Sequence, residues 1–236
     1  IITDELSEHF YNLARVFLNN AIEHTGICIS GSCGSGKSYF LKMLAYLLEN
    51  KSVGEKTTLQ YFDDKFQDQA PLLQADFRLI VSQSPMDVVL FNIVNRTLRH
   101  SLSRKKDIVA VFLDVFNEML GFCCDNPWIA DLERKMIKDG TYETFKQVYR
   151  DLAQITWDGS DGSDEGRDTF HFVFDRDIII QALVQSKAMT SEEAAGKLYE
   201  IANTQPYNIS IERFCQIVKE YCDLQGPSHR IVFLVD

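Results

Sequence analysis

Hydrophobic positions in the first fifty residues follow two helical patterns separated by a strand-like run. Apolar residues recur every three or four positions across 6–17, behind capping residues at 3–4, which predicts an amphipathic helix that ends near 19–23. The short, partly β-branched run 26–30 precedes several glycines and is typical of a buried strand. A second apolar stripe across 39–49 predicts another helix.

Shorter apolar runs punctuate the rest of the chain. Those at 59–62, 79–81 and 88–93 predict strands, and the pattern is strongest at 88–93. The chain closes with an apolar run over 231–235 that predicts a buried strand followed directly by the carboxylate of Asp236.

From about 107 to 222 the helical period dominates. An acidic, glycine-rich loop at 158–166 interrupts it. We expect helices over the ranges 108–119, 129–138, 142–155, 175–187, 191–202 and 210–224.

Composition narrows the classes of protein. The chain has 236 residues, of which 45% are hydrophobic, so it can bury a substantial core. Its net charge of −10 argues against a protein that grips nucleic acid through a broad basic face. The six cysteines lack the C-x-x-C spacing of a zinc site, which indicates free thiols in a reducing cytoplasm. Because no apolar run approaches the ~20 residues needed to cross a bilayer, and the start is acidic rather than signal-like, we expect no membrane association.

The clearest chemical signal is the complete phosphate-loop (Walker A) pattern G-x-x-x-x-G-K-S at 31–38, between the predicted strand and helix. Roughly 0.004 matches are expected by chance for a chain of this composition. Glycines let backbone N–H groups approach phosphate, and the following helix adds its partial positive charge. Lys37 is the candidate catalytic residue, because its amine would reach the β- and γ-phosphates. The candidate ATP-binding residues are Gly31, Ser32, Cys33, Gly34, Ser35, Gly36, Lys37, Ser38 and Tyr39.

A second carboxylate-bearing strand would complete such a site. Asp236, after five apolar residues, fits the Walker B pattern, and we expect it to hold Mg²⁺ together with the Ser38 hydroxyl. The predicted strand at 88–93 lies between the two motifs, which is the arrangement of additional-strand ATPases, including AAA+ proteins. In those proteins a catalytic glutamate follows the aspartate. The sequence stops at Asp236, so we expect a fragment of a longer polypeptide that is poorly active alone.

These motifs predict an α/β fold: a P-loop NTPase of the AAA+ or additional-strand type, with a parallel-sheet core and a large α-helical insertion. The predicted domains are an N-terminal helix (1–25), a P-loop core with Walker A (26–106), the helical insertion (107–224) and the Walker B strand (225–236).

Several blocks along the chain resemble the P-loop ATPases of BREX phage-defence systems, of the BrxC/PglY type. Ser32 and Cys33 depart from that pattern, since many relatives carry two aromatic residues there. The blocks lie at 28–31, 34–42, 89–93, 115–121, 129–133, 226–227 and 229–236.

The resemblance implies the N-terminal ATPase region of a large bacterial cytoplasmic protein. ATP binding and hydrolysis would drive assembly or remodelling of a defence complex that acts on DNA. Other proteins of the system would be its partners, the full-length protein would form a homo-oligomer, and DNA would be contacted indirectly. Two alternatives stay open: an AAA+ loader or initiator that acts directly on DNA, and a nucleotide switch that regulates oligomerisation without hydrolysis.

Weaker signals each have two interpretations. The basic stretch 96–106 suits DNA or an acidic partner, but also a solvated loop. The loop at 158–166 is acidic but lacks the EF-hand spacing, which favours a flexible loop over a calcium site. Cys33 is either a redox-sensitive thiol or merely a small loop residue. Arg230 could face a neighbouring subunit or form a simple salt bridge. The aromatic residues Trp128, Trp157, Phe112, Phe116 and Phe122 are candidates for the core of the insertion.

Overall fold

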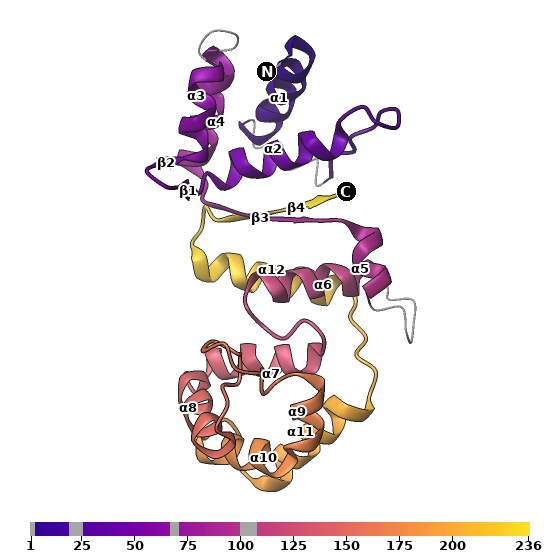
Figure 1. Cartoon of the computed structure of the whole chain (residues 1–236), viewed down its shortest axis with the longest axis vertical. Helices are drawn as coiled ribbons and strands as arrows, with labels where there is room; N and C mark the ends of the chain where they lie inside the picture. Colours follow the sequence, from indigo (N-terminus) through magenta and orange to yellow (C-terminus); the bar gives the residue numbers. More distant parts are fainter. Residues whose placement is uncertain (1–2, 19–25, 67–70, 100–107) are drawn as a thin grey trace. The chain divides into compact units, whose positions relative to one another are not determined.

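The computed structural model describes residues 3–18, 26–66, 71–99 and 108–236. The chain forms two compact units (Figure 1). The first unit combines Ile1–Arg104 with Cys215–Asp236, and the helical unit comprises Lys105–Phe214. Helix α12 (Ile211–Gln225) begins in the helical unit and ends in the first unit.

Two small sheets occur in the described part of the first unit. A short antiparallel hairpin pairs β1 (Ser52–Val53) with β2 (Lys56–Thr57). The parallel sheet pairs β3 (Met86–Phe91) with β4 (Arg230–Val235), in a register that runs from Met86 opposite Arg230 to Phe91 opposite Val235. The helices of this unit are α1 (Asp4–Leu18), α2 (Lys37–Glu49), α3 (Thr58–Phe66), α4 (Pro71–Gln83) and α5 (Ile93–Arg99).

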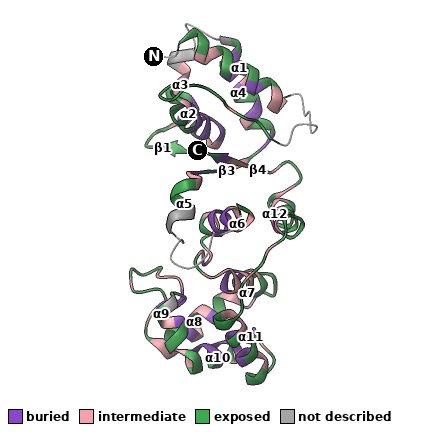
Figure 2. Ribbon diagram, turned by 90° about the vertical axis from the view of Figure 1, so that its right-hand side faces the viewer, coloured by how far each residue is buried: buried purple, intermediate pink, exposed green. Residues whose placement is uncertain are grey.

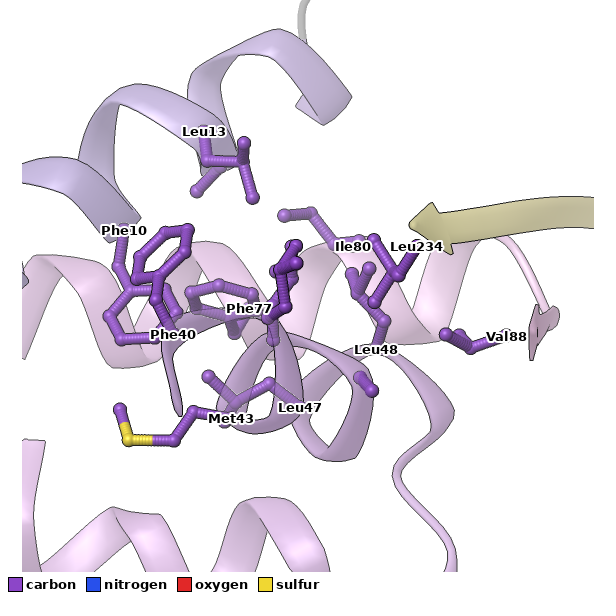
Figure 3. Packing of buried hydrophobic residues seen from close by; sticks show 14 of the residues in the cluster. Phe10, Leu13, Phe40, Met43, Leu47, Leu48, Phe77, Ile80, Val88 and Leu234 are labelled. Atoms are coloured by element: carbon purple, nitrogen blue, oxygen red, sulfur yellow. The ribbon is translucent and has the colours of Figure 1, made fainter. Parts of the chain in front are cut away.

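The core of the first unit lies where α1, α2 and α4 meet the parallel strands (Figure 3). The rings of Phe10 and Phe40 stack at 4.6 Å, and Phe77 meets Phe10 edge-on at 6.0 Å. Val88 from β3 and Leu234 from β4 join the same cluster. Burial of these side chains is the main force that fixes α2 against the strand pair.

The helical unit contains α6 (Ile108–Met119), α7 (Pro127–Lys138), α8 (Tyr142–Ala153), α9 (Thr169–Phe174), α10 (Arg176–Gln185) and α11 (Glu192–Thr204). Figure 2 shows buried positions along α7, α8 and α10. Fully buried Trp157 is at the centre of an aromatic cluster, with edge-on contacts to Phe145 at 4.9 Å and to Tyr149 at 5.2 Å.

A buried carboxylate forms hydrogen bonds to several residues of this core. Glu133 on α7 is fully buried and accepts hydrogen bonds from the Trp157 indole, the Tyr142 hydroxyl and the Cys123 backbone N–H. The guanidinium of Arg167 lies 2.8 Å from Glu133 Oε1 and supplies the balancing charge. A buried ion costs little only when it is paired and hydrogen-bonded in this way.

The predicted helices are all confirmed. The 3.6-residue pattern located α1, α2, α6, α7, α8, α10, α11 and α12, each to within a few residues. The strands predicted at 88–93 and 231–235 correspond to β3 and β4. The short helices α5 and α9 and the hairpin had not been predicted, because each is too short to show a clear period.

Two predicted strands are wrong. The run 59–62 lies in α3, where the side chains of Thr57 and Gln60 exchange hydrogen bonds with each other's backbone N–H groups. This is a capping box, and its T-x-x-Q signature was present in the sequence. The run 79–81 lies in α4, because Ile80 continues a buried stripe with Leu73 and Phe77 at helical spacing.

The strand expected at 26–30 is also not formed, since residues 26–32 belong to neither described sheet. A strand is stabilised by hydrogen bonds to a neighbouring strand. Ile29 is nevertheless partly buried against the core of the first unit.

Trp157 and Phe116 are core residues as expected, whereas Trp128, Phe112 and Phe122 are only partly buried. Arg230 donates a hydrogen bond to the Phe17 carbonyl at 3.5 Å. Residues 100–106 of the basic stretch lie outside the described residues.

Candidate functional site

The phosphate-loop motif forms a turn that leads into α2. Gly36 caps the helix with φ 87°, a left-handed conformation that favours glycine. Gly34 also has a positive φ, of 78°. At Gly31 an added Cβ would lie 2.7 Å from Ser35 Oγ, so a side chain there would require Ser35 to move. Gly34 and Gly36 therefore adopt backbone conformations that favour glycine, and Gly31 lies where a side chain has no room unless Ser35 moves.

Lys37 folds back over the loop that precedes it. Its amine donates hydrogen bonds to the carbonyl oxygens of Gly31 at 3.0 Å and Ser32 at 2.8 Å. Because Lys37 is also the first residue of α2, the side-chain charge and the positive end of the helix occupy the same side of the loop. The arrangement concentrates positive potential where an anionic group would bind.

Ser38 and Asp236, which are 198 positions apart, meet at the beginning of α2. The Ser38 hydroxyl donates a hydrogen bond to Asp236 Oδ1 at 2.7 Å. The two candidate metal-binding side chains are thus adjacent in the structure.

Asp236 is held by the end of β3. Its backbone N–H donates to the Phe91 carbonyl at 3.0 Å, and its carbonyl accepts from the Ile93 N–H at 3.1 Å. These bonds continue the parallel pairing of β3 with β4 by one residue. The carboxylate is therefore positioned by the backbone of two strands as well as by its contact with Ser38.

The pair suits a small divalent cation. Two oxygens that bind one Mg²⁺ at neighbouring octahedral positions lie about 3 Å apart, since each Mg–O bond is about 2.1 Å long. The 2.7 Å separation between Ser38 Oγ and Asp236 Oδ1 is close to that value. Among the described residues, no group of three or more His, Cys, Asp or Glu side chains could hold a metal ion. A cation here would complete its coordination with water and phosphate oxygens.

The remaining predicted site residues lie on the exterior. Cys33 is exposed within the loop, and Tyr39 is 63% exposed one residue beyond Ser38. Neither side chain belongs to the packed core of the first unit.

A polar cluster near the other end of the strand pair was not predicted. The Asp87 carboxylate accepts a hydrogen bond from the Tyr221 hydroxyl and lies 2.8 Å from His229 Nε2. Burial and the nearby Asp87 raise the pKa of Tyr221 above its usual value. No sequence pattern indicated this cluster, because it forms only when β3 and β4 pair. Through these contacts, Tyr221 and His229, which precede β4, bind to Asp87 on β3.

No protein-family model matches the chain, and no solved structure matches it. None of the helices in the described ranges combines the length and apolar character needed to cross a bilayer.

Cys33 offers a test that leaves the loop intact. We expect Mg-ATP to slow alkylation of Cys33 by iodoacetamide, because a nucleotide seated on the loop would cover this exposed thiol. Peptide mapping by mass spectrometry measures each cysteine separately. The exposed Cys215 should react at the same rate with and without nucleotide.

Cys123 is the control that should react slowest with iodoacetamide in the same experiment. It is buried, and burial raises the pKa of its thiol to about 12, so little thiolate is available. Equal rates at Cys33 with and without Mg-ATP would contradict binding at the loop.

Proposed function

We propose that this chain is the ATP-binding region of a large bacterial anti-phage defence ATPase of the BREX type. In the full-length protein, ATP binding and hydrolysis would drive assembly or remodelling of a defence complex that acts on DNA. The hydrogen bond of 2.7 Å between Ser38 and Asp236 is the observation that best supports nucleotide binding. It joins the end of the phosphate-loop motif to the carboxylate of the Walker B pattern.

The residues present suit Mg-ATP. Lys37 would exchange its bonds to the loop carbonyls for the β- and γ-phosphates, and the loop N–H groups would orient those phosphates. Ser38 and Asp236 would hold Mg²⁺ through their side-chain oxygens. When bound, the cation supplies charge neutralisation on the transferred phosphoryl group.

The proposed fold is a P-loop NTPase with a parallel sheet larger than the described pair. Two features support it: β3 and β4 are parallel and adjacent, and the apolar segment 26–30 leads directly into the phosphate loop. A cytoplasmic location, homo-oligomerisation and partners within the defence system belong to the same proposal. They rest on the sequence resemblance.

The metal pair gives the sharpest test. Ser38→Ala and Asp236→Asn should each weaken Mg-ATP binding by about tenfold, equivalent to ~1.4 kcal/mol, while binding of ATP in EDTA should stay near the wild-type value. The selectivity arises because each change removes a cation ligand and leaves Lys37 and the loop amides in place. Isothermal titration calorimetry with the full chain measures both affinities.

Asp223→Asn serves as the matched control, because Asp223 is an exposed carboxylate of the first unit that pairs with Lys219. It should change neither affinity. If Asp236→Asn binds Mg-ATP as tightly as the wild type, the assignment of the cation to this pair is incorrect.

A further inference from the structure

The short helix α9 presents an apolar face to solvent. Phe170, Val173 and Phe174 are 65%, 45% and 71% exposed. Their spacing of three and four residues places them on one face of the helix. The rings of Phe170 and Phe174 lie 4.8 Å apart, so they form one continuous aromatic surface.

The opposite side of α9 is anchored in the helical unit. Phe172 is buried, and its ring stacks on Tyr199 at 5.2 Å. The Tyr199 hydroxyl donates to the Val173 carbonyl at 2.7 Å, and the Asp168 side chain caps the helix by accepting from the His171 N–H at 2.9 Å. The helix is held at both ends and along its inner side. Its exposed phenylalanines therefore sit on a fixed support.

Two carboxylates lie beside this face, and a third is in the adjoining loop. The His171 ring lies between Asp164 at 3.9 Å and Asp175 at 3.4 Å, and it meets the Phe170 ring edge-on at 5.5 Å. Asp164 is 85% exposed. Hydrogen bonds from Ser163 and then Thr156 lower the pKa of Asp161, in the same loop, to about 2, so its charge persists at neutral pH.

Few cations offset these charges. The stretch 158–177 contains seven Asp and Glu but only two arginines. Arg167 pairs with the buried Glu133 and with Glu165, and Arg176 pairs with Asp177. Lys146 on α8 pairs with Asp158. Across the whole helical unit, 20 Asp and Glu face 12 Lys and Arg, a net charge of −8 out of the −10 carried by the chain.

We infer that the α9 face is a docking surface for a basic, amphipathic segment of a partner protein. Apolar side chains of that segment would cover Phe170 and Phe174, and its lysines or arginines would pair with the nearby carboxylates, among them the exposed Asp164. Nucleic acid fits poorly, because phosphates would be repelled. The same face of a second copy fits poorly too, because it would bring its own exposed Asp164 against that of the first. The inference does not depend on nucleotide binding.

A synthetic helical peptide of lysine and leucine is a suitable probe, with a glutamate and leucine peptide of the same spacing as control. Fluorescence anisotropy with the full chain should detect binding of the basic peptide only. The variant Phe170→Ser/Phe174→Ser should weaken that binding by about tenfold or more, because it removes the apolar contact and keeps every charge. Asp164→Asn should reduce the salt dependence of binding.

Ile137→Ser is the matched control, since Ile137 is a 48% exposed apolar residue elsewhere in the helical unit. It should bind the basic peptide like the wild type. Circular dichroism must show that each variant keeps the wild-type helix content.

Three outcomes would overturn the inference. The double phenylalanine variant could bind the basic peptide normally, or the glutamate and leucine peptide could bind equally well. Alternatively, sedimentation could show that the chain self-associates and that the double variant alone abolishes this, which would make the face an interface between copies.

Discussion

Replacing Lys37 by alanine is expected to weaken ATP binding by about 100-fold, equivalent to ~2.7 kcal/mol. In the structure the Lys37 amine lies 3.0 Å from the Gly31 carbonyl and 2.8 Å from the Ser32 carbonyl, directly over the loop. No other cationic side chain occurs between residues 26 and 41, so its loss would leave only backbone N–H groups and the helix end to offset the phosphates. Titration of a fluorescent ATP analogue in EDTA isolates this effect from that of the cation.

Lys42 provides the control within the same helix. It is also in α2 and is exposed, but it belongs to neither motif. Lys42→Ala removes the same charge and should change affinity by less than about threefold, because screening weakens a solvent-exposed charge. Equal losses in the two variants would mean that net charge, rather than the loop, governs binding. An unchanged affinity in Lys37→Ala would refute nucleotide binding at this loop.

The helices were predictable from the sequence because their packing repeats along the chain. In α7, for example, Ile129, Leu132 and Met136 recur at helical spacing, and all three are buried. The same logic failed at 59–62 and 79–81, where local β-branched and aromatic residues outweighed the wider pattern. In both cases residues outside the short apolar run decided the structure. A capping box begins α3, and a buried stripe runs along α4.

The candidate site shows a different limit of sequence reasoning. The residue types at Ser38 and Asp236 were recognisable because their chemistry follows a known spacing within each motif. Their proximity was expected as well, since both were assigned to one Mg²⁺. What the sequence did not show is the pairing of β4 with β3 that brings Asp236 to the beginning of α2. The contacts of Asp87 with Tyr221 and His229 depend on the same pairing and follow no motif, so nothing in the sequence pointed to them.

The helical unit should depend strongly on a single buried ion pair. Glu133→Ala is expected to lower the free energy of unfolding by about 3 kcal/mol, because it removes the buried partner of Arg167 and leaves only the half-exposed Glu165 to balance that charge. The indole of Trp157, which donates to Glu133 at 2.9 Å, would lose its acceptor as well. Urea denaturation followed by circular dichroism measures the change.

Glu143→Ala is the matched control, because it removes the same kind of side chain from an exposed pair. Glu143 is 83% exposed and lies 2.9 Å from the Lys146 amine, so its loss should cost less than about 1 kcal/mol. Glu133→Gln separates the effect of charge from that of shape, since it keeps hydrogen-bonding capacity but removes the buried counter-charge of Arg167 and leaves only Glu165. If Glu133→Gln were as stable as the wild type, hydrogen bonding alone would hold this core. If Glu133→Ala were no worse than Glu143→Ala, the buried carboxylate would be dispensable and the aromatic cluster around Trp157 would carry the stability.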